Sequence, residues 1–213
     1  MRFMVEPFEH PLQCPANRLL KRVADICFSI FALVTILWWL HLVFVILIRA
    51  TSPGRAVFRQ IRIGRDGCPF ICYKYRTMVY AADELEKPRI MEDSAHRVTW
   101  IGRFLRTSNL DELPQFINVL KGDMSVVGPR PHMLGEDELL PEHIPYYRQR
   151  LLVIPGITGW AAINGFRGGS DMAHMRCRVD LDVWYIRNWS LWLDLRIAAT
   201  TAWRMLTFRA GGQ

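Results

Sequence analysis

Two adjacent carboxylates, Asp111 and Glu112, are the side chains in this sequence best placed to do chemistry. Ser108 and Asn109 precede them as good helix N-caps, and the apolar residues up to Leu120 recur at helical spacing. The sequence therefore predicts a short amphipathic helix with both carboxylates in its first turn. The positive end of the helix dipole would keep them ionised and could also hold a phosphate. Acidic first-turn residues commonly only complement the dipole, so a catalytic role needs support from other features.

A cation is implied if these carboxylates share their site with a phosphate, because the like charges would otherwise repel each other. Mg²⁺ typically takes one or two carboxylates together with phosphate oxygens of a substrate. The carboxylate pair therefore favours phosphoryl chemistry assisted by Mg²⁺.

Three basic residues could supply positive charge for the same phosphate. Arg130 lies between Pro129 and Pro131, which hold the backbone extended and present the guanidinium with little entropy left to lose. Lys74 and Arg76 alternate onto one face of a predicted strand. Solvent-facing loops and strands show the same patterns, so these residues gain weight mainly from the nearby acidic pair.

A glycine-rich segment over residues 155–169 contains a fourth basic residue of interest, Arg167. Its glycines lack the spacing of a dinucleotide-binding or Walker loop. Backbone N–H groups in such a loop can cradle a phosphate, although turn formation is the commoner reason for glycine.

Composition limits the class of protein and its partners. The 213 residues suffice for one domain, and 51% of them are hydrophobic, concentrated near the N-terminus and in a tryptophan-rich C-terminal stretch. The net charge of +7 indicates an anionic partner, either membrane headgroups or a phosphorylated substrate, and no motif points to nucleic acid. The Cys68–Cys72 spacing lacks a second pair for zinc, and five unpaired cysteines suit a reducing compartment.

The apolar run Ile26–Ile48 predicts a membrane helix, with residues 18–50 as the inserted segment and residues 1–17 as a flexible leader. Basic residues flank the run on both sides, so the positive-inside rule draws both ends to the cytoplasm. A re-entrant helix would satisfy both flanks and would keep His41 near the headgroups. An ordinary spanning helix remains the alternative.

Residues 51–213 are expected to form a small catalytic domain on the cytosolic face. Val57–Ile63 and Phe70–Tyr75 predict a β-hairpin, and Ala81–Lys87 predicts a short charged helix. Arg106 is a possible ion-pair partner of Asp111. The tryptophans and arginines after Leu181 favour amphipathic helices on the membrane surface, with burial in the core as the alternative. The predicted fold class is α+β, attached to one face of a membrane by one helix.

Five motifs occur in order along the chain. They are Lys21-Arg22 with Asp25; Ser52-Pro53-Gly54 through Phe58-Arg59-Gln60 and Gly64; Tyr73-Lys74-Tyr75-Arg76-Thr77-Met78; Leu110-Asp111-Glu112-Leu113-Pro114 through Gly122-Asp123-Met124-Ser125 and Gly128-Pro129-Arg130-Pro131; and Pro155-Gly156-Ile157-Thr158-Gly159-Trp160. With these motifs the chain, from about Lys21 to Leu206, resembles the bacterial sugar transferase family, the small monotopic phosphoglycosyl transferases that start lipid-linked glycan assembly.

The resemblance implies transfer of a hexose 1-phosphate from a UDP-sugar to undecaprenyl phosphate, with release of UMP. This would be the first membrane step of exopolysaccharide or glycoconjugate synthesis, at the bacterial inner membrane. Asp111 would attack the β-phosphorus and hold the phosphosugar covalently, while Glu112 would bind Mg²⁺. Lys74, Arg76 and Arg130 would neutralise phosphate, and Arg167 lies where the family places nucleotide contacts.

The sequence departs from the family in its membrane helix. Family members usually break this helix with a Ser-Pro pair, whereas Leu37-Trp38-Trp39 stands here without proline. A kink must therefore have another cause, or the helix is straighter. The sugar also stays open among glucose, galactose and N-acetylated amino sugars, as does a homo-oligomeric state.

Two other functions compete with the transferase. A catalytically silent membrane scaffold for glycan-assembly proteins would have no need of the charged pair Asp111-Glu112. An unrelated Mg²⁺-dependent hydrolase of lipid phosphates would release inorganic phosphate and ignore nucleotide sugars. The identity of the product separates all three.

Overall fold

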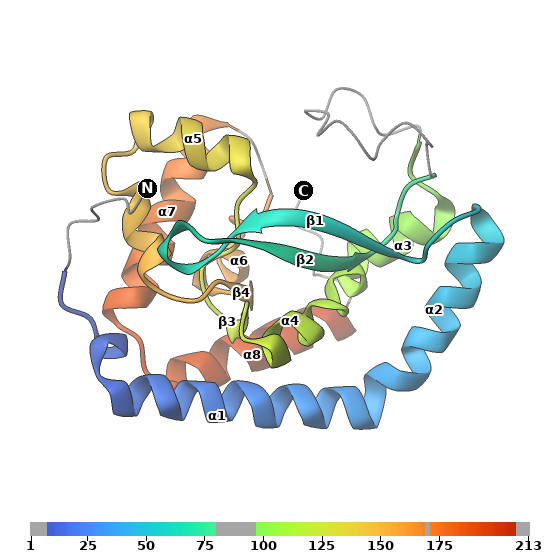
Figure 1. The fold of residues 1–213 in the computed structure, drawn as a ribbon, viewed down its shortest axis with the longest axis horizontal. Helices are drawn as coiled ribbons and strands as arrows, with labels where there is room; N and C mark the ends of the chain where they lie inside the picture. Colours follow the sequence, from blue (N-terminus) through green and yellow to red (C-terminus); the bar gives the residue numbers. More distant parts are fainter. Residues whose placement is uncertain (1–7, 80–96, 169–170, 208–213) are drawn as a thin grey trace.

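The computed structural model describes residues 8–79, 97–168 and 171–207. One long N-terminal helix lies along a body of shorter helices and two small two-stranded sheets (Figure 1). This mixture of helix and sheet agrees with the predicted α+β class. The short charged helix predicted over Ala81–Lys87 lies outside the described residues. The helices after the hairpin are α3 (Trp100–Ser108), α4 (Gln115–Lys121), α5 (Leu134–His143), α6 (Trp160–Ile163), α7 (Met172–Arg187) and α8 (Leu191–Leu206).

The predicted membrane segment lies within one continuous helix, Pro15–Thr51, which is 37 residues long and apolar enough to cross a membrane. At 1.5 Å per residue it measures about 55 Å, more than the roughly 30 Å of a bilayer's hydrocarbon core. The helix also begins earlier than predicted. Residues 8–17, expected to belong to a flexible leader, instead include a 3₁₀ turn at Pro11–Gln13, the buried side chain of Leu12 and the start of the helix.

The helix bends without proline. Helix α1 (Pro15–Ala32) passes into a π-helical turn, Leu33–Leu37, and α2 (Trp38–Thr51) then leaves at a sharp angle to α1 (Figure 1). A π-turn disturbs the regular hydrogen-bond ladder and is a recognised cause of kinks. Within this turn Thr35 Oγ1 donates to Phe31 O over 2.7 Å. The kink therefore arises from backbone hydrogen bonding in place of a Ser-Pro pair.

The predicted β-hairpin is confirmed. Strand β1 (Val57–Ile63) pairs antiparallel with β2 (Pro69–Tyr75). Asp66 and the glycine after it adopt positive φ angles of 58° and 75° in the turn. The hydroxyl of Tyr75 lies 2.8 Å from Nδ1 of His41 on α2, which gives that histidine a polar partner. The long N-terminal helix and the hairpin are thus joined directly.

The two carboxylates do not begin a helix. Helix α3 continues through Ser108, whose hydroxyl donates to Phe104 O over 2.7 Å, and Asn109 ends that helix with a left-handed φ of 58°. Asp111 and Glu112 then lie in a 3₁₀ turn before α4. Asn109 is thus the C-cap of α3 and also the N-cap residue of the 3₁₀ turn with the carboxylates, whereas Ser108 lies inside α3 and caps neither. Asparagine suits this junction because it tolerates the left-handed conformation that closes a helix.

A second, parallel pair of strands leads to Arg130. Strand β3 (Ser125–Val127) pairs with β4 (Gly156–Thr158), and their backbones are so close that a Cβ on Gly156 would lie 2.0 Å from Gly128 N. Helix α1 holds β3 by polar contacts. Asp25 Oδ1 accepts hydrogen bonds from the Ser125 hydroxyl (3.0 Å) and Val126 N (2.9 Å).

Lys21 extends this polar contact to the C-terminal helices. Its Nζ donates to Val127 O over 2.9 Å and to Asp194 Oδ2 over 2.7 Å. Asp194 also accepts hydrogen bonds from the Tyr185 hydroxyl (2.6 Å) and Trp189 Nε1 (3.0 Å). One buried carboxylate thus ties α1, α7 and α8 together.

The C-terminal tryptophans divide between core and surface. Trp189 is buried, whereas Trp192 and Trp203 on α8 are 75% and 66% exposed. Helix α8 therefore presents large aromatic side chains outward, as a helix on a membrane surface would.

Removing the cation of the buried Lys21–Asp194 ion pair should lower the free energy of unfolding. The change Lys21→Met would leave Asp194 charged, buried and without its cation, which costs about 3–5 kcal/mol of folding free energy. We expect a lowered thermal midpoint, followed by circular dichroism. The control is Lys121→Met, whose ion pair with Asp123 is long (3.9 Å) and exposed, and which should change stability by less than about 1 kcal/mol. Equal effects of the two changes would contradict the structural role of Lys21.

Candidate active site

Glu112 is the centre of a cluster of charges. Its Oε1 accepts hydrogen bonds from Lys74 Nζ and from Arg130 Nη2, both at 3.0 Å, and its Oε2 accepts one from Arg167 Nη2. The glutamate is only 4% exposed, so the three cations replace the water that would otherwise solvate it. Three basic residues that the sequence pointed to therefore converge on one of the two predicted carboxylates.

Four separate parts of the chain build this cluster. Lys74 comes from β2, Arg130 from the proline-flanked segment after β3, and Arg167 from the loop between α6 and α7. The carboxylates come from the 3₁₀ turn Leu110–Glu112. Strand alternation explains Lys74, whose side chain points to the same face of the hairpin as the buried Cys72.

The side chain of Asn118 on α4 fixes the strand that carries Lys74. Its Oδ1 accepts a hydrogen bond from Tyr73 N (3.0 Å), and its Nδ2 donates to Ile71 O (2.6 Å). The asparagine amide thus pairs with the free edge of β2 as a neighbouring strand would. Since α4 follows the acidic turn directly, this contact aligns Lys74 with Glu112.

The neighbouring cations decide the ionisation of Glu112. Burial alone would raise its pKa, but Arg130, Arg167 and Lys74 together hold the pKa of Glu112 well below its usual range. In return, the Glu112 carboxylate raises the pKa of Arg130. Glu112 is therefore an anion at neutral pH.

Asp111 has a different environment. Burial and the adjacent charge of Glu112 raise the pKa of Asp111, while Lys74, Arg167 and Arg130 act in the opposite direction from a distance. In the described part of the chain, Asp111 makes no ion pair within 4 Å. Its carboxylate is thus less committed to partners than that of Glu112 and is the freer of the two to react.

Arg106 does not take the role expected for it. Its Nε donates to the Thr77 hydroxyl over 2.8 Å, and no ion pair joins it to Asp111 among the described residues. Helix α3 directs this side chain toward the end of the hairpin.

Arg76 also lies apart from the cluster. Arg76 follows the last residue of β2, and its N still donates to Ala56 O over 2.8 Å. Its guanidinium instead donates to the main-chain carbonyls at the end of α2, at Ser52 (2.6 Å), Pro53 (2.6 Å) and Ile48 (3.3 Å). The structure therefore gives Arg76 a helix-capping role, and its phosphate contact stays a prediction.

The carboxylates offer the hard oxygen ligands that Mg²⁺ prefers. Glu112 Oε2 accepts from one cation and Oε1 from two, which leaves Oε2 a lone pair, and Asp111 lies beside it. Among the described residues, no group of three or more His, Cys, Asp or Glu side chains could hold a metal ion. A magnesium ion would thus be held by this pair together with oxygens of a substrate.

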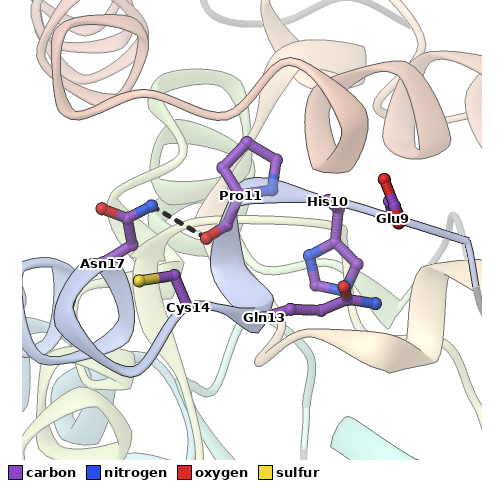
Figure 2. Close-up of a pocket in the computed structure, with 6 residues that line it drawn as sticks. All are labelled: Glu9, His10, Pro11, Gln13, Cys14 and Asn17. Atoms are coloured by element: carbon purple, nitrogen blue, oxygen red, sulfur yellow. Dashed lines mark hydrogen bonds between the residues drawn. The ribbon is translucent and has the colours of Figure 1, made fainter.

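Two hollows lie in the described structure. A narrow one of about 10 Å³ adjoins the cluster, and Arg130, Arg167 and Asp182 contribute to its walls. A more open one of about 470 Å³ lies at the start of α1, where Asn17 Nδ2 donates to Pro11 O over 2.8 Å (Figure 2). Its walls, from Glu9 to Asn17, contain none of the predicted site residues, so it is separate from the charge cluster.

Several residues behind the cluster were missed by sequence reasoning. None of Asn118, Arg150, Arg178 and Asp182 was singled out from the sequence. All four are buried. The Arg178 and Asp182 spacing of i, i+4 was the one available signal, because it places opposite charges on the same helix face.

Known proteins resemble this chain over most of its length. The "Bacterial sugar transferase" family matches residues 16–208. The UDP-glucose:undecaprenyl-phosphate glucose-1-phosphate transferase of Escherichia coli K12 is 44% identical over 203 residues, which are 94% of this chain and 43% of that protein. A protein of the same name from Caulobacter vibrioides is 44% identical over 199 residues, 92% of this chain and 73% of that protein.

A third relative acts on a different sugar by its name. The undecaprenyl-phosphate galactose phosphotransferase of Salmonella typhimurium is 38% identical over 206 residues, 88% of this chain and 40% of that protein. The chain thus spans less than half the length of the Escherichia coli and Salmonella relatives. With a family match over nearly all of its residues, the chain belongs to the bacterial sugar transferase family.

Proposed function

We propose that this chain transfers a hexose 1-phosphate from a UDP-sugar to undecaprenyl phosphate and releases UMP. The observation that carries the proposal is the convergence of Lys74, Arg130 and Arg167 on Glu112, directly beside Asp111. Three cations face two carboxylates, so the site keeps a net positive charge that suits a diphosphate. The names of the relatives favour undecaprenyl phosphate as the acceptor and glucose or galactose as the sugar.

The difference between the two carboxylates supports a two-step reaction. In the first step a carboxylate oxygen of Asp111 attacks the phosphorus bonded to the sugar, the bond from that phosphorus to the UMP oxygen breaks, and UMP leaves. In the second step an oxygen of the lipid phosphate attacks the same phosphorus, and the Asp111 carboxylate is released. A carboxylate nucleophile divides one difficult displacement into two easier ones.

The cations have a separate task. Phosphoryl transfer spreads negative charge over the equatorial oxygens of phosphorus, and positioned cations stabilise that charge. Lys74, Arg130 and Arg167 are held in place by Glu112, so they need little reorganisation when a substrate arrives. When bound to Glu112 and a substrate, Mg²⁺ would add further positive charge at the same oxygens.

We infer that the long helix enters the membrane and returns to the same face. The π-turn at Leu33–Leu37 bends it, and basic residues flank both of its ends. Its large apolar side chains are mostly exposed, as lipid contact requires, and the exposed tryptophans of α8 suit the interface. The active site would then lie on the cytosolic face of the bacterial inner membrane, where UDP-sugars occur.

The reaction can be tested by its product. Detergent-solubilised protein should release UMP from UDP-glucose or UDP-galactose when undecaprenyl phosphate and Mg²⁺ are both present, and chelation of the metal should stop turnover. A coupled UMP assay with a panel of UDP-sugars would identify the substrate. Release of inorganic phosphate from the lipid alone would support a hydrolase, and a folded protein without turnover would support a scaffold.

A substitution that replaces one side-chain oxygen tests the role of Asp111. Asp111→Asn removes the nucleophilic oxygen with little change in shape, so we expect UMP release to fall by at least about 10³-fold, as for other lost nucleophiles. Wild-type protein given a UDP-sugar labelled in its sugar should retain the label covalently without lipid, whereas the variant should not. Asp66→Asn in the exposed hairpin turn is the matched control and should stay active. Normal turnover by Asp111→Asn would rule out the covalent route.

Two native cysteines report the topology. Cys14 precedes α1 and Cys68 follows α2 in the hairpin turn, and both are exposed. In variants that keep only one of these cysteines, a membrane-impermeant maleimide should label neither in spheroplasts and both in inside-out vesicles. Labelling of one of the two from outside would indicate a helix that spans the membrane.

A further inference from the structure

Arg167 and Arg130, two of the cations on Glu112, are each held at their main chain by a further buried arginine. Arg178 on α7 donates from Nε to Phe166 O (2.8 Å) and from Nη2 to Gly168 O. These two carbonyls flank Arg167 on either side. Arg178 therefore fixes the loop at the point where Arg167 turns toward Glu112.

A second buried arginine, Arg150, acts in the same way on Arg130. Its Nη2 donates to the main-chain carbonyl of Arg130 over 2.6 Å. The same guanidinium donates from Nε (3.1 Å) and from Nη2 (2.6 Å) to Asp182 Oδ2. Arg150 thus connects the backbone of a site arginine to an anion within α7.

Asp182 forms an ion pair with Arg150 over 2.6 Å and lies one helical turn from Arg178. It is 1% exposed and lies four residues after Arg178, on the same face of α7. Arg178 and Arg150 both counteract the burial that raises the pKa of Asp182. Burial, together with Arg130 and Arg150, lowers the pKa of Arg178 to about 10. Three arginines, Arg130, Arg150 and Arg178, therefore lie near one another, and their repulsion makes a purely space-filling role for Arg178 energetically costly.

Arginine suits this task because its donors are fixed in a planar fork that can hold two carbonyls together. A lysine could hold one of them at a time, and an apolar side chain neither. The main chains of Arg167 and Arg130 would then be free to shift. An error of about 1 Å in a positioned group can cost about 100-fold in rate.

We propose that Arg178 and Arg150, with Asp182 as their shared counter-charge, are positioning residues that aim Arg167 and Arg130 at the reacting phosphate. The proposal rests on the proposed transferase function and deepens it, because neither arginine needs to touch the substrate. A positioning residue should act on turnover through the residue that it positions, and through no other route.

A double-mutant cycle tests this dependence. Arg178→Met removes both donors but keeps most of the apolar stem, and we expect it to lower kcat/KM for UMP release about 10- to 100-fold. Arg178→Lys should recover part of that loss. When Arg167 is already changed to Met, adding Arg178→Met should lower kcat/KM by less than about 3-fold. If the losses in kcat/KM from Arg178→Met and Arg167→Met multiply fully in the double variant, the proposal is overturned.

Arg22→Met is the matched control. This arginine also holds main-chain carbonyls, at Val119 and Leu120, but on α4 rather than beside Arg167. Its effect on kcat/KM should multiply with that of Arg167→Met, because the two act independently. Non-additivity in this control as well would show a general loss of folding, and it would contradict a specific link between Arg178 and Arg167.

A measurement without turnover separates this inference from the proposed function. Amide hydrogen exchange over residues 160–168 should become faster in Arg178→Met than in the wild-type protein, while residues 115–121 of α4 stay unchanged. If Arg178→Met is too unstable to purify, Arg178→Lys should show a smaller increase over the same residues. Unchanged exchange at 160–168 would overturn the positioning role even if UMP release is found. Faster exchange in a protein that releases no UMP would support the loop contact and refute the transferase.

Discussion

The structure depends on one buried anion, the carboxylate of Glu112. A buried charge is tolerable only when it is paired, and here Lys74, Arg130 and Arg167 together supply the pairing. These cations come from a hairpin, from the segment after a parallel strand and from a loop before α7. The need to neutralise Glu112 therefore brings distant parts of the chain to one point. The same cations are then held ready for a phosphate, so the interaction that stabilises the fold also organises the site.

Contacts behind the cluster hold each cation in register. Asn118 fixes the edge of β2, Arg150 fixes the carbonyl of Arg130, and Arg178 fixes both sides of Arg167. Helix α1 adds a further support, because Asp25 and Lys21 bind the strand that leads to Arg130. A helix that is apolar on its outer side thus carries buried charges on its inner side. If the helix enters a membrane as we propose, this arrangement would link its insertion to the geometry of the site.

The two adjacent carboxylates differ because their neighbours differ. Glu112 is held by three cations and keeps a low pKa, whereas burial and the charge of Glu112 raise the pKa of Asp111. Both residues lie in the 3₁₀ turn Leu110–Glu112, where consecutive side chains point in different directions. In the reaction we propose, Glu112 is therefore the structural anion and Asp111 the reactive one. The paired residues are alike in chemistry and distinct in surroundings.

Local signals in the sequence determined several features by themselves. Strand alternation around Asp66-Gly67 was sufficient for the hairpin, the apolar run for the long helix, and the proline-flanked arginine and acidic pair for most of the site. Features that depend on distant contacts were decided by the tertiary structure. Arg76 binds the carbonyls at the end of α2, Asn109 ends α3 as well as preceding the carboxylates, and the π-turn bends a helix that has no proline there. The burial of Arg150, Arg178 and Asp182 likewise depends on which surfaces pack together. The sequence does not distinguish a charged residue in water from one that is buried against another charge.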